Sequence, residues 1–249
     1  AVLFLWQGLQ TQRWWPFVAS GLFWGSAFYT YQAAWVFPGV LVLFVIYKVF
    51  QERGFVERYA WKLLLLVLVA AVVIFPLGEF AYRNPWMFFM RTQQVGVFGT
   101  GGGSQTPMAS MLNNAGKVAG GFLFAGPASD GNRLYTRPPL PLFLALTFYF
   151  ALLLAVARAR RPAYALLLIW CLWMWLPSIL ADDAPSIRRM IGSLPAIMIL
   201  VAAGLGWLFD AARALLGSVK FGRKAGLAAA GVALSGLLMS AQASGLGDM

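Results

Sequence analysis

Two aspartates and two arginines stand close together in the segment Asp182-Asp183-Ala-Pro-Ser-Ile-Arg188-Arg189. Arginine presents a planar fork of N–H donors that fits phosphate oxygens, and carboxylates orient such arginines or hold a metal ion. The segment joins two apolar runs, and four charges are costly to place at a membrane surface without a purpose. These residues predict a phosphate-binding site. As an alternative, Asp182 or Asp183 caps the following helix and pairs with Arg188.

Further arginines belong to connections that we place on the same side of the apolar runs. We expect a lipid phosphate to be held by Arg91, Arg133, Arg137 and Arg188, with support from Asp182, Asp183, Arg189 and Arg83. Cations in such a position stabilise the charge that develops on a departing phosphate. For any single arginine, snorkelling and ion pairing with Glu79 or Asp130 is an equal alternative.

An aromatic hairpin and the lack of histidine limit the remaining chemistry that the chain could perform. Tyr29, Tyr31 and Gln32 could stack on a sugar and hydrogen-bond to it, although tyrosine is also common at membrane interfaces. The chain has no histidine, and its single cysteine, Cys171, lies in an apolar run. The usual metal clusters and histidine acid–base chemistry are therefore excluded. We assign no metal ligand or cofactor, and leave open a divalent cation held by the aspartates.

The composition indicates that these residues are carried by membrane-spanning helices. Of the 249 residues, 61% are hydrophobic and 11% are charged, with a mean hydropathy of +0.73. These values lie outside the range of soluble proteins, so the bilayer is a partner of this chain. The net charge of +11 is distributed in short clusters between apolar runs rather than along one face. This pattern argues against nucleic-acid binding and indicates membrane topology.

The apolar runs predict an all-α, polytopic transmembrane bundle of about seven helices. We expect spans near residues 15–31, 34–50, 61–80, 139–157, 163–180, 190–209 and 225–242. The chain then divides into three spans in 1–80, an extracytoplasmic loop in 81–138 and four further spans in 139–249. Gly21 and Gly25 have the spacing of a close helix contact.

Basic residues in alternate connections predict the orientation of the bundle. One side collects twelve of the nineteen: Arg13, Lys48, Arg53, Arg58, Lys62, Arg158, Arg160, Arg161, Arg213, Lys220, Arg223 and Lys224. By the positive-inside rule this side, with the N-terminus, faces the cytoplasm. On the opposite side, residues 84–98 and 108–124 are amphipathic and suit interfacial helices of the long loop. We interpret the glycine-rich residues 99–106 between them as a hinge rather than a phosphate-binding loop.

Several stretches resemble bacterial membrane glycosyltransferases related to the protein O-mannosyltransferases and the aminoarabinose–lipid A transferase. They are residues 25–35, 130–133, 137–139, 177–188, 191–195 and 202–205. The resemblance implies a GT-C fold in the inner membrane of a bacterium. It also implies transfer of a sugar from a polyprenyl-phosphate-linked donor to a protein, lipid or glycan acceptor at the outer face. The family's catalytic carboxylate would lie upstream of Ala1, with further N-terminal helices of a longer parent chain.

The chain departs from this family at Ser186, where relatives often carry histidine, and at Leu134 and Tyr135, where they carry His-Asn. Two other classes stay open. A transporter or flippase of a lipid-linked or anionic substrate should place charges near the bilayer midplane, whereas these apolar runs are almost free of charge. A non-catalytic scaffold predicts that neutralising Arg188 or Arg91 leaves the parent's activity intact, while changes at Gly21 or Gly25 abolish it.

Overall fold

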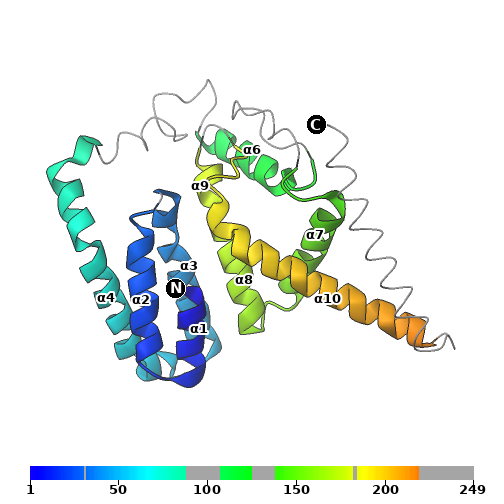
Figure 1. Ribbon diagram of the computed structural model, residues 1–249, viewed down its shortest axis with the longest axis horizontal. Helices are drawn as coiled ribbons and strands as arrows, with labels where there is room; N and C mark the ends of the chain where they lie inside the picture. The colour runs from blue at the N-terminus through cyan, green and yellow to red at the C-terminus, as the bar shows by residue number, and fades with distance from the viewer. Residues whose placement is uncertain (31, 88–106, 125–137, 182–183, 219–249) are drawn as a thin grey trace.

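The computed structural model describes residues 1–30, 32–87, 107–124, 138–181 and 184–218, and every regular element in these ranges is a helix (Figure 1). The elements are α1 (Val2–Thr11), α2 (Trp15–Ala27), η1 (Gln32–Val36), α3 (Pro38–Gln51), α4 (Phe55–Arg83), α6 (Pro107–Gly120), α7 (Leu142–Ala157), α8 (Pro162–Trp173), α9 (Leu176–Ile179), η3 (Ile191–Ser193) and α10 (Leu194–Ser218). The expected all-helical class is confirmed for this part of the chain.

Proline and glycine mark where these helices begin. Pro16, Pro38, Pro162 and Pro177 each lie in the first turn of a helix. Proline is tolerated there because the first N–H groups of a helix have no intrahelical acceptor. Between α3 and α4 the chain turns at Gly54, whose φ of 76° lies in the left-handed region that a residue without Cβ adopts without strain.

The helices form two groups that share α8. One buried cluster joins α1, α2, α3 and α4 to Leu166 and Met174, which belong to α8 and to the turn that follows it. A second cluster joins α6, α7 and α10 to the other face of the same segment, through Leu168, Cys171 and Trp175. In Figure 1, α8 accordingly lies between the two groups, with α4 at one side of the molecule and α10 at the other.

Four described helices are long and apolar enough to cross a membrane: Ala34–Gln51, Phe55–Arg83, Pro162–Ile179 and Ile191–Ala214. The apolar helix α7 has 16 residues, and α2 has 13. Both are shorter than the roughly 17 residues that a span needs. The span expected at 225–242 lies outside the described residues. Seven spans are therefore not confirmed, whereas several apolar helices that could span a membrane are.

Several boundaries differ from the expectation. The span expected at 163–180 is divided into α8 and α9, and α10, expected to end near 209, continues to Ser218. Residues 2–11, to which we assigned no span, form the short helix α1, and Leu5 is buried in its cluster. The helix expected at 61–80 runs from Phe55 to Arg83, since its charged ends continue the α-helical hydrogen bonding. The helix expected in 108–124 ends at Gly120, where the chain turns.

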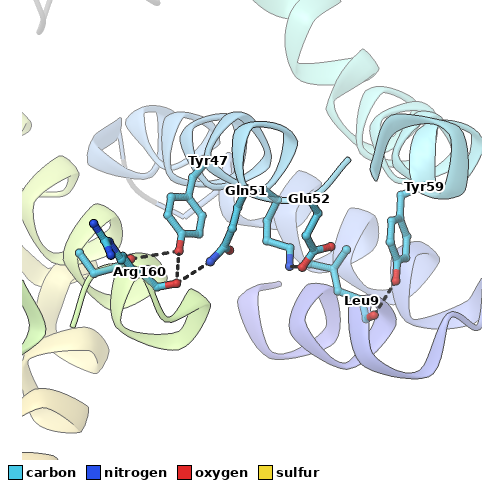
Figure 2. Close-up of polar contacts among 8 residues, drawn as sticks. Leu9, Tyr47, Gln51, Glu52, Tyr59 and Arg160 are labelled. Atoms are coloured by element: carbon cyan, nitrogen blue, oxygen red, sulfur yellow. Dashed lines mark hydrogen bonds and ion pairs between the residues drawn. The ribbon is translucent and has the colours of Figure 1, made fainter. Parts of the chain in front are cut away.

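The described basic connections gather at one end of the molecule, the lower end in Figure 1, where α3 meets α4 and α7 meets α8. Figure 2 shows how this end is held together. The hydroxyl of Tyr47 donates to the carbonyl oxygens of Ala159 and Arg160, each 3.0 Å away, and Gln51 donates to the same Arg160 carbonyl. Helix α3 is thus fixed to the turn between α7 and α8.

Candidate functional site

The charged segment identified in the sequence follows α9 at the end of the molecule opposite the basic connections (Figure 1). We call residues 181–190 the charged loop; the structure describes Ala181 and residues 184–190 of it. Ser186 is 3% exposed, Arg188 is exposed and Arg189 is half-buried. The loop therefore has a buried middle and presents arginine at its surface.

A residue of the long connection, Asn114 on α6, holds the beginning of the charged loop. Its side-chain amide donates to the carbonyl oxygen of Ile179 at 3.1 Å and to that of Ala181 at 2.9 Å. Asn114 is only 4% exposed, so these bonds form in a site with little water. Carbonyls at the end of a helix such as α9 lack intrahelical partners, and a side-chain amide supplies the missing donors.

The rest of the loop is held from α8 and α9. The backbone N–H of Ser186 donates to the hydroxyl of Ser178 at 2.8 Å, in a fully buried setting. Beyond the loop, the indole N–H of Trp170 donates to the carbonyl oxygen of Gly192 at 2.8 Å. These two hydrogen bonds, one buried and one partly buried, fix the backbone on either side of Arg188 and Arg189.

Helix α6 is itself anchored to the bundle. Val118 is fully buried, and Phe122 just beyond the helix packs between Phe148 and Trp175, with ring centroids 5.3 Å and 5.9 Å away. Tyr149 of α7 donates to the carbonyl of Ala119. The expected amphipathic segment is therefore a helix, but its C-terminal apolar face is in the protein core. Figure 1 shows α6 lying across the upper ends of α7 and α9.

The structure does not bring all the expected phosphate ligands together. Arg83 ends α4, where it pairs with Glu79 at 2.6 Å. In Figure 1 the upper end of α4 and the short helix α9, which precedes the charged loop, lie on either side of α2 and α3. Five further candidates lie outside the described residues: Arg91, Arg133, Arg137, Asp182 and Asp183.

One member of the expected sugar-contacting group is described with its side chain. The hydroxyl of Tyr29 donates to the carbonyl oxygen of Val73 on α4 at 2.7 Å, and 51% of the residue is exposed. Pro76 lies one turn further along α4 and lacks the N–H that would bond to the carbonyl of Val72. The turn after α2 thus supplies a donor to the carbonyl next to the one that Pro76 leaves without its helical N–H. Tyr31 and the side chain of Gln32 lie outside the description.

Metal binding has no candidate among the described side chains, where no three of His, Cys, Asp and Glu come together. Asp182 and Asp183, to which we tied a divalent cation, are not among those residues.

The residues that support the charged loop were not identified from the sequence. Asn114 and Val118 are four residues apart and so share one face of α6. A polar side chain on an otherwise apolar face signals a buried partner, and this signal was present in the segment. Ser178 and Trp170 gave no such signal, because serine and tryptophan are ordinary residues of an apolar helix near a membrane surface.

A scan of protein-family models finds no match for the chain, and comparisons with curated proteins and with solved structures find none either.

Proposed function

We propose that the chain takes part in transfer of a sugar from a polyprenyl-phosphate-linked donor to a protein, lipid or glycan acceptor. In this proposal it is a GT-C glycosyltransferase with about seven spans in the inner membrane of a bacterium. The basic end and the N-terminus face the cytoplasm, and the charged loop faces the outer side. The proposal starts from the sequence resemblance and depends on one structural observation.

That observation is the anchoring of the charged loop. Asn114, Ser178 and Trp170 hold the backbone before, within and beyond it, and Arg188 is at its surface. Preorganised donors stabilise developing charge better than mobile ones, because they need no reorganisation during the reaction. A phosphate that leaves the sugar carbon gains negative charge, and a guanidinium stabilises this charge by donating two parallel hydrogen bonds to the phosphate oxygens.

Other parts of the reaction are assigned by the resemblance. The carboxylate that activates the acceptor belongs, in this proposal, to a segment preceding Ala1. Arg91, Arg133 and Arg137 complete the phosphate site with Arg188, and Asp182 and Asp183 orient these arginines. The exposed ring of Tyr29 is left to stack on the sugar, since its hydroxyl is bound to Val73.

Transport is the less favoured reading for a specific reason. In the four described candidate spans, charged residues occur only near the ends, such as Lys48, Glu57, Glu79 and Asp210. Substrate sites of secondary transporters lie near the bilayer midplane, at broken or polar helices. The central parts of these four helices carry no charge.

The test is sugar transfer from a polyprenyl-phosphate donor by the full-length gene product in membranes. Arg188→Gln should lower the rate by about 100-fold, the loss typical of one transition-state donor. Arg188→Lys should give a rate between those of Arg188→Gln and the unchanged protein, because lysine keeps the positive charge but not the planar fork of N–H donors. Arg53→Gln, an exposed arginine at the opposite end, is the matched control and should change nothing. Unchanged rates in Arg188→Gln and Arg91→Gln would contradict the proposal.

A further inference from the structure

A hollow of about 790 Å³ runs along the outer half of α4, where Trp24 of α2 forms part of its wall. It follows α4 from Val67 to Arg83, which is about 24 Å at 1.5 Å per residue. Its lining is almost entirely apolar, and its charged residues, Glu79 and Arg83, both stand at one end. The hollow is separate from the charged loop.

Small residues between large ones make this hollow. Ala71 and Gly78 line it together with Phe75 and Tyr82, whose exposed fractions are 69% and 88%. A Cβ placed on Gly78 would meet no atom within 4 Å, so helix packing does not require glycine there. Glycine inside a helix is less favourable than alanine, and at this position it leaves the groove open.

The charged end carries both signs. Glu79 and Arg83 lie one helical turn apart with 2.6 Å between their carboxylate and guanidinium groups, and both side chains are accessible. Such an exposed pair can exchange its internal contact for contacts with a ligand at small cost. Guanidinium fits phosphate, and carboxylate accepts N–H donors from an ammonium group.

We propose that this groove binds a glycerophospholipid whose headgroup carries a primary ammonium, that is, phosphatidylethanolamine. The phosphate lies at Arg83, the ammonium at Glu79, and one acyl chain lies between Phe75, Tyr82 and Trp24. Half of a hydrocarbon core is roughly 15 Å thick, so the groove accommodates the whole depth of a chain in one leaflet. This inference does not rest on the proposed sugar transfer.

The same geometry disfavours other lipids. Phosphatidylglycerol has a phosphate for Arg83 but no cation for Glu79, which leaves a carboxylate beside an anion. Phosphatidylcholine has a cation with no N–H to donate, so the hydrogen bonds to Glu79 are lost. The expected preference is therefore for the primary amine over both.

The experiment is native mass spectrometry of the delipidated full chain, incubated with each of the three lipids at equal concentration. Phosphatidylethanolamine should be retained at least about fivefold more than the others, which corresponds to the net contribution of one ordinary hydrogen bond. Glu79→Gln should remove the preference for the amine, and Arg83→Gln should lower retention of all three lipids. Gly78→Leu should block retention by filling the groove.

Gly206→Leu is the matched control, because Gly206 is also an exposed helical glycine whose Cβ would meet no atom within 4 Å. It should retain phosphatidylethanolamine like the unchanged protein. Equal retention of the three lipids would overturn the proposal. So would a Gly78→Leu variant that still binds phosphatidylethanolamine as Gly206→Leu does, or a groove occupied by a second copy of the chain. Loss of sugar transfer without a change in lipid retention bears only on the proposed function.

Discussion

The side-chain amide of Asn114 donates a hydrogen bond to the carbonyl oxygen of Ala181, 2.9 Å away in a buried site. The two residues belong to different connections, since Asn114 lies on α6 and Ala181 directly precedes Asp182. Helix α6 and the beginning of the charged loop are therefore held together.

Asn114→Ala should loosen the charged loop. It removes two donors from buried carbonyl groups, which costs about 2 kcal/mol of local stability. Hydrogen exchange of the reconstituted protein should become faster by about 30-fold in residues 178–190. Asn113→Ala is the control, because Asn113 is exposed on the same helix. Equal protection in both variants would show that Asn114 does not hold the loop.

Gly21→Val should separate α2 from α4. A Cβ on Gly21 would lie 2.5 Å from the carbonyl oxygen of Leu66, and one on Gly25 would lie 2.7 Å from the Cβ of Val73. Backbone atoms at this distance must move, so we expect a loss of about 2 kcal/mol or more in unfolding free energy. Denaturation in mixed micelles would measure it, with Gly206→Val as the variant that meets no neighbour. A Gly21→Val protein as stable as that control would contradict the packing.

Two substitutions of Tyr29 separate its hydrogen bond to Val73 from the sugar contact that the proposed function assigns to its ring. Tyr29→Phe removes the bond to Val73 but keeps the ring, so stability should fall by about 1 kcal/mol while the KM for the sugar donor stays the same. Tyr29→Ala removes the ring as well and should raise that KM by roughly 2- to 10-fold. If the alanine variant also keeps its KM, the ring does not contact the sugar.

Tyr47→Phe should weaken the contact between α3 and the turn from α7 to α8. Loss of the hydroxyl leaves the carbonyls of Ala159 and Arg160 with one donor fewer, which should lower the free energy of unfolding by about 1 kcal/mol (Figure 2). Thermal unfolding of the purified protein is the measurement. Tyr82→Phe, at a residue 88% exposed, is the control and should keep its midpoint. Identical midpoints for both variants would show that the Tyr47 hydroxyl is not stabilising.

The helical class and much of the helix placement could be predicted, because apolar length and proline positions act locally. Gly21 and Gly25 were also interpreted correctly as a close contact, and the structure places them against α4. The number of spans could not be confirmed from the described helices, since α2 and α7 are shorter than their apolar runs suggested. Hydropathy depends on amino-acid composition alone, whereas a helix ends where its backbone N–H and C=O groups form other hydrogen bonds.

The candidate site was predictable only in part. Charge density pointed to Arg188 and Arg189, but nothing local to residues 182–189 indicates that Asn114 or Trp170 holds the loop. Such contacts depend on how distant segments fold back. Arg83 was grouped with Arg188 because both lie on the same predicted side, and position along the membrane normal says nothing about lateral distance. The fold places them at separate parts of that side (Figure 1).

The bond between Asn114 and Ala181 joins residues 67 positions apart, and the bond to Ile179 spans 65. During synthesis, α6 is made before α7, α8 and α9, and both acceptor carbonyls lie further along the chain. The side-chain amide of Asn114 therefore has neither acceptor available until the chain has been made through α9. The contact between α6 and the charged loop can form only after the helices between them have been synthesised.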